Sequence, residues 1–452
     1  MSRRRTHASV WRHKFATCAC LSCRVSLGSF PKRLAGVFLL VSLAPASFAQ
    51  RAFTWTEIRD RFLAVNPTLI AGQLNINESR TQEITAYLRP NPDFTSILDQ
   101  VNPFTSQPSI STGANGYRPF GYALPSWSSS YLHERGGKRE LRRESAQQGT
   151  SIAVSQQADL QRNLVFNLRN AFVQLLQAKA VLALAQDNLA YYRQLLQVSN
   201  DRFKAGDIAR VDLDRLQVQE IQYETDVQTG LVNVKTAKIQ LLMLLNDRTP
   251  VDQFDVTGTF EDFREPALTL EELHRTALAN RPDLQVAMQA IQKAQTDHRL
   301  AVANGATDVT FGVDFARNPP IPVYLGFNVN IPLRIFDRNQ GEKARTELDI
   351  TRNQRLRDAA EAQVYGDVDS AFATLTSNLE LVRRYKAQFL DQAARVRDTI
   401  AFSYQRGGAS LLDFLNAQSD YRTVRLSYLN LVGSFLAAAS QLDLATGSDV
   451  IP

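Results

Sequence analysis

The stretches 203-FKAGDIARVDLDRLQ-217 and 404-YQRGGASLLDFLNAQ-418 decide the fold, because they are two versions of one motif placed 201 residues apart. In each, an aromatic residue precedes a glycine by three positions, and an aspartate follows that glycine by six. A glycine just past the end of one helix and a carboxylate in the first turn of the next are signals for a sharp helix–helix turn. The two stretches therefore predict two helical hairpins of the same design.

A second pair of blocks repeats upstream, at a spacing of 215 residues. The segment 54–58 (TWTEI) corresponds to 269–273 (TLEEL), and Asn66-Pro67 corresponds to Arg281-Pro282. The difference between the two spacings means that the first copy holds about 14 additional residues between its blocks. Two blocks repeated in the same order predict two tandem copies, 50–266 and 267–452.

Each glycine turn is predicted to join two long helices. From 164 to 203, apolar or small residues recur in alternating steps of four and three, which is the 3.5-residue period of a coiled coil. The period continues past each turn, so the helix pairs are expected at about 138–246 and about 341–446. In the second copy the predicted seam of the outgoing helix comprises Phe372, Leu375, Leu379, Val382, Lys386, Phe389, Ala393, Val396 and Ile400.

A short β-region precedes each helix pair. In the second copy it is a hairpin at about 309–332, whose strands alternate apolar residues with small or polar ones. A membrane strand has this pattern, and so does an ordinary half-buried hairpin. The first copy is expected to hold its hairpin at about 91–132, around a loop rich in Pro, Ser and Gly. The predicted lipid-facing set on the last strand is Val323, Leu325, Phe327, Val329 and Ile331.

The N-terminus has the pattern of a secretory signal peptide over 1–49. Residues 1–33 are basic without any acid, 34–46 are apolar, and Ser47-Phe48-Ala49 fits a cleavage site. The apolar run of about 13 residues is shorter than the ~20 that a membrane-spanning helix needs. All three cysteines (18, 20 and 23) lie in this segment, and none follows the apolar run, so no lipid attachment site is expected.

Removal of residues 1–49 changes the charge balance. The remaining chain has 43 Lys and Arg against 45 Asp and Glu, a formal net charge of −2. The basic pI of about 9.2 therefore belongs to the whole precursor. It gives no reason to expect nucleic-acid binding.

The two glycine turns resemble those of the TolC family of outer-membrane efflux proteins. Two further motifs strengthen the resemblance: Gly136-Gly137-Lys138-Arg139 and 331-IPLRIFDRNQG-341, which lead from each β-region into a long helix. The second of these is most similar to the branch that serves heavy-metal efflux pumps. The resemblance covers the whole chain after residue 49.

The resemblance implies a mainly α fold with a β-barrel portion. Long coiled-coil helices would form a periplasmic α-barrel, and each protomer of a homotrimer would give four strands to one transmembrane β-barrel in outer-membrane lipid. The protein would be the passive exit duct of a tripartite efflux system. Its partners would be a periplasmic adaptor and an inner-membrane pump, with metal cations as a candidate cargo.

Specific residues follow from the same resemblance. Asp212, Tyr404 and Asp413 fall on the family's periplasmic gate, where the Tyr404 hydroxyl is expected to donate a hydrogen bond to Asp212. The adaptor-docking turns would use Lys204, Gly206, Arg406 and Gly407. The chain departs from the family pattern at Asn416, where the family has a second aspartate, and at Ala409, where it has an arginine.

One alternative stays open, a secreted periplasmic coiled-coil scaffold without a channel. An enzyme is not expected, because the chain after residue 49 has only His133, His274 and His298, without metal-ligand spacing, and no phosphate-binding loop. No cofactor, metal site or nucleic-acid partner is predicted.

Overall fold

The computed structural model describes residues 52–109, 112–261, 269–318 and 321–449. The predicted signal peptide, with its three cysteines, lies outside these residues. The chain divides into 1–49 and 50–452, and the following concerns the second unit alone. Within the described ranges, no helix is long and apolar enough to cross a membrane.

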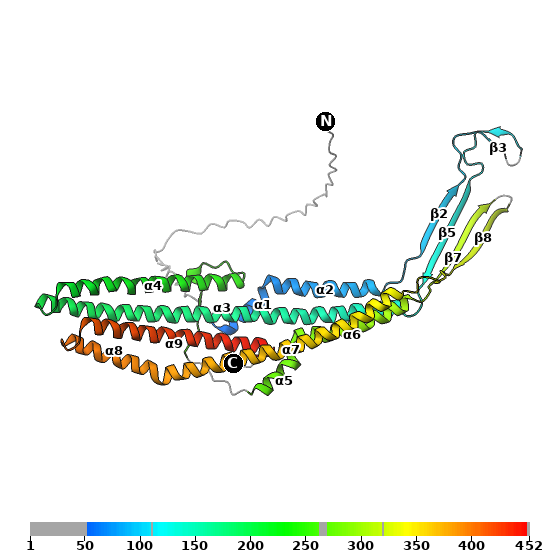
Figure 1. Cartoon of the computed structure of the whole chain (residues 1–452). Helices are drawn as coiled ribbons and strands as arrows, with labels where there is room; N and C mark the ends of the chain where they lie inside the picture. The colour runs from blue at the N-terminus through cyan, green and yellow to red at the C-terminus, as the bar shows by residue number, and fades with distance from the viewer. Residues whose placement is uncertain (1–51, 110–111, 262–268, 319–320, 450–452) are drawn as a thin grey trace, which may run out of the picture. The chain divides into compact units, whose positions relative to one another are not determined.

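The two halves of the chain present the same order of elements (Figure 1). The first half contains α1 (Trp55–Val65), α2 (Pro67–Tyr87), β2 (Asp93–Asp99), β5 (Leu124–His133), α3 (Lys138–Ala205) and α4 (Arg210–Leu244). The second contains α5 (Leu270–Asn280), α6 (Pro282–Asn304), β7 (Val309–Asn318), β8 (Ile321–Asn330), α7 (Gln340–Arg384), the π-helical turn η2 (Tyr385–Phe389), α8 (Leu390–Gln405) and α9 (Leu411–Thr446). Shorter pieces are β1 (Ala52–Phe53), β3 (Gln107–Pro108), β4 (Asn115–Gly116), the 3₁₀ turn η1 (Val251–Gln253) and β6 (Asp255–Val256). The predicted fold class, mainly helical with a small β portion, is confirmed.

Equivalent residues begin the first helix of each half. The hydroxyl oxygens of Thr54 and Thr269 accept backbone N–H groups of Glu57 and Glu272, both at 3.4 Å. The Glu57 carboxylate accepts the Thr54 N–H at 2.9 Å in return, which completes a capping box. Helices α1 and α5 consequently start at corresponding positions and are both 11 residues long.

The long helices lie side by side, with α3 packed against α2, α4, α6 and α9 (Figure 1). One hydrophobic cluster joins side chains of both halves, so the halves share a core. Its members include Phe62, Leu168, Leu241, Phe254, Val364 and Phe435. A separate, smaller cluster lies toward the α3–α4 and α8–α9 turns, and it includes Leu189, Tyr192, Leu216, Tyr223, Ala401, Tyr404 and Phe414.

One antiparallel sheet of four strands is built from both halves, in the order β2-β5-β7-β8. The strands β5 and β7 pair across the two halves, with Trp127 opposite Phe315. The hairpin β7–β8 places Val313 opposite Phe327. Strands β2 and β8 each pair on one side alone among the described residues, so both edges of the sheet are open.

The predicted seam of the second outgoing helix is wrong at three positions beyond Val382. Lys386, Phe389 and Val396 are exposed, whereas Leu390 packs against the core and the Arg397 side chain is only 18% exposed. The turn η2 explains the difference, because a π-helical turn holds one more residue than an α-helical turn. Leu390 and Arg397 are therefore each one residue later than the predicted seam positions Phe389 and Val396, whereas Ile400 of the predicted seam still packs against the smaller cluster.

Candidate functional site

The two glycine turns have the same backbone hydrogen bonds. In the α3–α4 turn, the N–H groups of Gly206 and Asp207 donate to the carbonyls of Phe203 and Arg202, at 3.0 and 2.9 Å. In the α8–α9 turn, Gly407 and Gly408 donate to Tyr404 and Ser403, at 3.1 and 2.8 Å. Both pairs form the 5→2 and 6→1 bonds of a Schellman motif.

Gly206 and Gly407 are needed for this geometry, because their φ angles are +84° and +78°. Side chains other than glycine are strained in this left-handed region. A Cβ on Gly206 would meet no atom within 4 Å, so the requirement is conformational and not steric. The two predicted docking glycines thus have a clear role in shaping the turns.

The helices that leave the two turns are capped differently. Asp413 and Ser410 form a capping box, in which the Asp413 carboxylate accepts the Ser410 hydroxyl at 2.7 Å and the Asp413 N–H donates to that hydroxyl at 3.1 Å. The corresponding Asp212 follows Ala209, which has no side-chain cap. Asp212 lies 3.9 Å from Arg215 and is 36% exposed. Asp413 is therefore held in place by the cap, whereas Asp212 is held only by a long ion pair.

Tyr404 is buried and stacks on Phe414, with 5.2 Å between the ring centroids. Its hydroxyl oxygen is buried without a hydrogen-bond partner among the residues that the structure describes. The hydrogen bond expected between Tyr404 and Asp212 is therefore not formed within one chain.

The two turns are joined through Arg202 instead. Its Nη1 donates to the backbone carbonyl of Tyr404 at 2.8 Å, and its guanidinium lies 5.4 Å from the centre of the Tyr404 ring. Farther from the turns, Arg422 of α9 forms an ion pair with Asp226 of α4 at 2.8 Å. Polar contacts therefore join the two helix pairs both at the turns and farther along α4 and α9.

The remaining predicted docking residues lie on the surface of the turns. The Lys204 ammonium is 3.3 Å from Asp201, and both side chains are about two-thirds exposed. The Arg406 guanidinium covers the ring of Phe402 at 4.3 Å. Both cations are accessible to a partner.

The sheet has one apolar face and one polar face. Directly opposite residues point to the same side of a sheet, so the register assigns every side chain to a face. The apolar face carries Phe94, Trp127, Tyr131, Phe311, Val313, Phe315, Val323, Leu325, Phe327 and Val329. Most of these side chains are exposed, Phe327 by 77%. The predicted lipid-facing residues of β8 all lie on this face.

The opposite face carries small and polar groups, including Ser128, Asp314 and Gly326 in one row. Asn328 donates to the Asp314 carboxylate at 2.7 Å on this face. A Cβ on Gly312 would lie 2.5 Å from the Asn328 amide oxygen, so a larger residue there would require the Asn328 side chain to move. One sheet thus separates two environments, one apolar and one polar.

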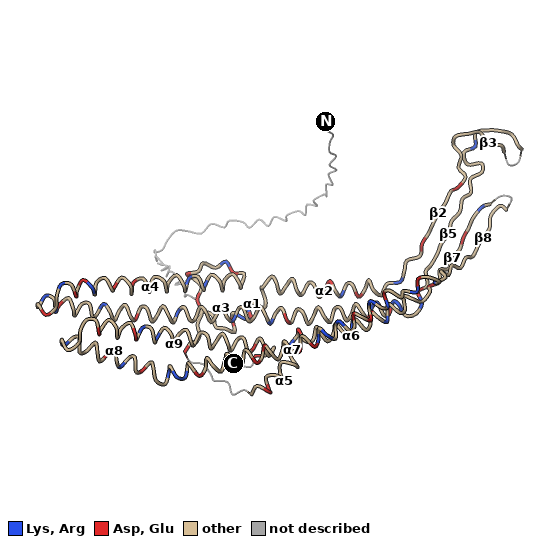
Figure 2. The backbone as a smooth tube through the Cα atoms, viewed as in Figure 1, with Lys and Arg blue, Asp and Glu red and all other residues tan. Residues whose placement is uncertain are grey.

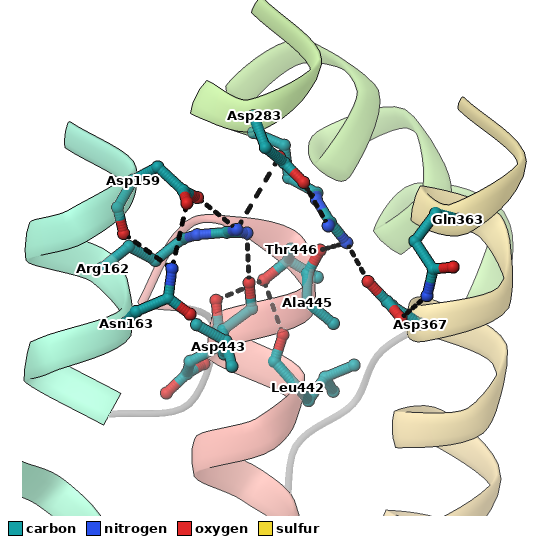
Figure 3. Close-up of polar contacts among 12 residues, drawn as sticks. Asp159, Arg162, Asn163, Asp283, Gln363, Asp367, Leu442, Asp443, Ala445 and Thr446 are labelled. Carbon is teal, nitrogen blue, oxygen red and sulfur yellow. Dashed lines mark hydrogen bonds and ion pairs between the residues drawn. The ribbon is translucent and has the colours of Figure 1, made fainter. Parts of the chain in front are cut away.

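A buried arginine cluster ties the start of α6 to the end of α9 (Figure 3). The Arg281 side chain is only 4% exposed and bonds Asp283 at 2.6 and 3.0 Å and Asp367 at 2.8 Å. It also donates to the Ala445 carbonyl at 3.4 Å. Although burial acts in the opposite direction, hydrogen bonds from Arg281 lower the pKa of Asp283. Arg162 joins the cluster through the Leu444 carbonyl at 2.8 Å.

Sequence reasoning missed Arg202 and gave Arg281 no role. Arg202 directly precedes the quoted turn motif, but no pattern in the sequence says that its guanidinium reaches a backbone carbonyl 202 residues away. Arg281 did carry a signal, because it stands where the first copy has the helix-capping Asn66. In the parts of the chain described here, no group of three or more His, Cys, Asp or Glu residues is arranged to hold a metal ion.

The chain is similar in sequence to one protein family and to individual known proteins. A family model described as "Outer membrane efflux protein" matches residues 273–448. The cobalt-zinc-cadmium resistance protein CzcC of Cupriavidus metallidurans is 26% identical over 336 residues, which is 70% of this chain and 75% of CzcC. The outer membrane protein TolC of Escherichia coli is 22% identical over 302 residues, which is 61% of either chain.

A solved structure of CusC, a protein described as forming a transmembrane channel, has a TM-score of 0.72. The superposition covers 87% of this chain and 92% of CusC, at 17% sequence identity. At that identity the likeness concerns the fold alone.

Proposed function

Because this chain belongs to the TolC family of outer membrane efflux proteins, we propose that three copies form one passive exit duct in the outer membrane. The observation that carries the proposal is the four-stranded sheet, with an apolar face, a polar face and two open edges. Open edges in lipid leave backbone groups unpaired, which costs several kcal/mol for each group. Joining β8 of one copy to β2 of the next removes those edges and closes a barrel. Its apolar face contacts lipid and its polar face lines the lumen.

The helices extend the duct into the periplasm, and the glycine turns close its inner end. Asp413, fixed by Ser410, gives each copy a carboxylate at a defined position near the turn. Three such carboxylates around one axis concentrate cations in a narrow wet pore. The Tyr404 hydroxyl is buried within its own chain, so a hydrogen bond to Asp212 requires this end of the helix pairs to rearrange. Within each copy, Arg202 holds the two turns together.

The turns also supply the surface for a periplasmic adaptor that leads to an inner-membrane pump. Lys204 and Arg406 are accessible cations on adjacent turns, and Gly206 and Gly407 set the shape that presents them. The similarity to CzcC, a cobalt-zinc-cadmium resistance protein, favours metal cations as the cargo. In this arrangement the duct provides a path and the pump supplies the energy.

Fractionation of cell membranes tests the proposal. We expect the chain in the outer-membrane fraction, running as a trimer on gels when the sample is not boiled, and forming ion-conducting pores in planar bilayers. A chain recovered in the soluble periplasmic fraction, without conductance, would favour the coiled-coil scaffold. Deletion of the chain in a metal-resistant host, with survival scored on cobalt, zinc and cadmium, tests the cargo separately.

A further inference from the structure

The end of the sheet that adjoins the helices carries an excess of positive charge. Four segments meet there: 87–93, 131–143, 305–308 and 331–345. Together they hold ten Lys and Arg against six Asp and Glu, a net charge of +4, whereas residues 50–452 as a whole have −2. We name these four segments the collar. Figure 2 shows basic and acidic residues gathered where the helices meet the strands.

Four of the six acidic groups of the collar are paired within the chain, and Asp93 and Asp337 have no ion pair among the described residues. Glu134 accepts both Nη atoms of Arg142, at 2.6 and 2.8 Å, and these hydrogen bonds lower the pKa of its carboxyl. Asp308 accepts the buried ammonium of Lys138 at 2.7 Å. The remaining pairs are Glu140 with Arg139 and Glu342 with Arg345.

Besides Arg143, which has no ion pair but lies over the Tyr87 ring at 4.7 Å, four arginines of the collar are left without an ion pair among the described residues: Arg89, Arg135, Arg334 and Arg338. Three of them, Arg89, Arg135 and Arg338, are exposed. The positive excess of the collar is therefore carried by guanidiniums that face outward and have no internal carboxylate. Guanidinium is the side-chain group best suited to phosphate, because its N–H groups form two parallel hydrogen bonds.

A cavity of about 300 Å³ opens beside one of these arginines. Arg89, Tyr131, His133 and Lys138 line it, together with the paired Glu134 and Glu140. The lining thus offers several N–H and O–H donors, and the charge of its two carboxylates is offset by Arg142 and Arg139. A small anionic group fits this chemistry.

Next to these arginines lies an apolar segment with nothing packed over it. Leu333, Ile335 and Phe336, in the connection between β8 and α7, are 80%, 62% and 90% exposed. They follow the last residue of β8, Asn330, by three to six positions. Arg334 and Arg338 alternate with them, so the segment offers hydrocarbon contact and cationic groups at the same level. Segments that lie in a membrane interface have this composition.

We propose that the collar binds the phosphate headgroup of an anionic phospholipid, with its acyl chains on Leu333, Ile335 and Phe336. The inference rests on the proposed membrane location of the sheet, because lipid on the apolar face puts its headgroups at the level of the collar. It names a binding partner that the duct function alone does not require. Arg338, beside the apolar segment, contacts this phosphate, and Arg89, at the opposite edge of the sheet, contacts a second headgroup. The apolar segment selects a lipid over free phosphate.

The test uses the purified full-length trimer in mild detergent, with thermal unfolding as the readout. Phosphatidylglycerol, phosphatidylcholine and inorganic phosphate are added in separate titrations. We expect phosphatidylglycerol to raise the unfolding temperature and the other two to leave it nearly unchanged. The double variant Arg89→Gln/Arg338→Gln should need about 5-fold more phosphatidylglycerol for the same shift, since each headgroup site loses one arginine that contributes about 5-fold near an anionic surface.

The double variant Arg355→Gln/Arg395→Gln is the matched control, because it removes two exposed cations from α7 and α8, away from the collar. It should respond like the unchanged protein. Phe336→Ser, which alters no charge, should weaken the response to phosphatidylglycerol through loss of acyl-chain contact.

Equal shifts from phosphatidylglycerol and phosphatidylcholine, or an unchanged response of the Arg89→Gln/Arg338→Gln variant, would overturn the inference. A shift produced equally by inorganic phosphate would replace the lipid with free phosphate and overturn it as well. Unboiled gels and membrane fractions of each variant test the proposed function independently of lipid binding. A trimeric outer-membrane protein whose unfolding temperature does not depend on lipid charge would contradict lipid binding by the collar alone. A chain that forms no trimer would contradict the proposed duct.

Discussion

The two halves of this chain share a backbone plan but differ in the outgoing helix. In the first half, α3 runs without interruption from Lys138 to Ala205. In the second, the π-helical turn η2 separates α7 from α8. Core positions before η2 correspond at a spacing of 200 residues, as Leu168, Ala171 and Leu175 do with Val368, Ala371 and Leu375. The turns correspond at 201. The second half therefore holds one inserted residue, and η2 is where the helix accommodates it.

The two halves also differ in the residue that joins the start of the second helix to the end of the last helix. Asn66 caps α2 and donates to the Leu244 carbonyl at the end of α4, at 3.2 Å. The corresponding Arg281 donates to the Ala445 carbonyl at the end of α9. Both junctions thus join the same two helix ends. The first uses a neutral amide, and the second uses a buried cation that requires two carboxylates. Repeat geometry is retained while the polar chemistry at each position changes.

Single-residue deletions in the outgoing helices of the two halves should have the largest effect on trimer formation. Deleting Lys386 should convert η2 into regular helix. Tyr404 would then follow Leu375 by 28 positions, as Phe203 follows Leu175. Deleting the equally exposed Gln186 in α3 turns all later residues by about 100° and removes Leu189 from its cluster. Each buried leucine lost costs about 1.5–3 kcal/mol. We expect trimer on unboiled gels for the first deletion and none for the second. The reverse result would show that η2 is not an insertion.

Substitution of the two junction residues should give the next largest effect. Arg281→Ala leaves Asp283 and Asp367 without their partner and should destabilise the fold by about 3–5 kcal/mol. Asn66→Ala removes a neutral cap and should cost about 1 kcal/mol. Chemical denaturation of the two variants in detergent measures the difference. Equal losses would mean that the Arg281 cluster contributes no more than an ordinary helix cap.

The two junctions should also differ in their response to acid. Arg281 holds the pKa of Asp283 below its ordinary value, so the pairing stabilises the fold above pH ~3.9, the ordinary aspartate value. This contribution is lost as the pH falls through the lowered folded-state pKa. Asn66 is neutral, so its contribution to stability does not depend on pH in this way. Between pH 5 and pH 3, the destabilisation caused by Arg281→Ala should therefore shrink relative to the unchanged protein, while that of Asn66→Ala stays constant. A parallel pH dependence of the two variants would contradict the assignment.

Helix capping at the turns should give the smallest effect. Ser410→Ala removes the cap of α9 and should destabilise by about 1 kcal/mol. Ala209→Ser places a hydroxyl at the matching position of α4, three residues before the first-turn aspartate at N3, and should stabilise by a similar amount. Thermal unfolding of both variants measures the opposite signs. Two changes of the same sign would show that the turns are not equivalent.

The sequence predicted the repeat, the long helices and the two faces of the last strand, because each depends on local periodicity. The alternation over Val323 to Ile331 assigns faces without knowledge of any partner strand. It did not predict η2, since one inserted residue leaves heptad spacing intact on both sides and changes only the phase between them. Lys386 and Phe389 fit the heptad, and only burial shows that they left the core face.

The polar contacts were the least predictable part of the candidate site. Asp413 and Asp212 occupy equivalent positions in the motif, yet only Asp413 has a serine three residues earlier. Tyr404 was expected to hydrogen-bond through its hydroxyl, whereas its backbone carbonyl receives Arg202. Long-range contacts of this kind depend on how two helix pairs lie together. No local pattern encodes that arrangement.

The central claim is that the sheet lies in a membrane with its apolar face toward lipid. The most direct measurement compares Phe327→Arg with Asn328→Arg, adjacent residues on opposite faces, in isolated outer membranes. Arginine on a lipid face costs about 2–4 kcal/mol at mid-bilayer and much less in the lumen. We predict a marked loss of trimer for Phe327→Arg, and normal trimer with altered single-channel conductance for Asn328→Arg. Equal amounts of trimer with unchanged conductance in both variants would contradict the account.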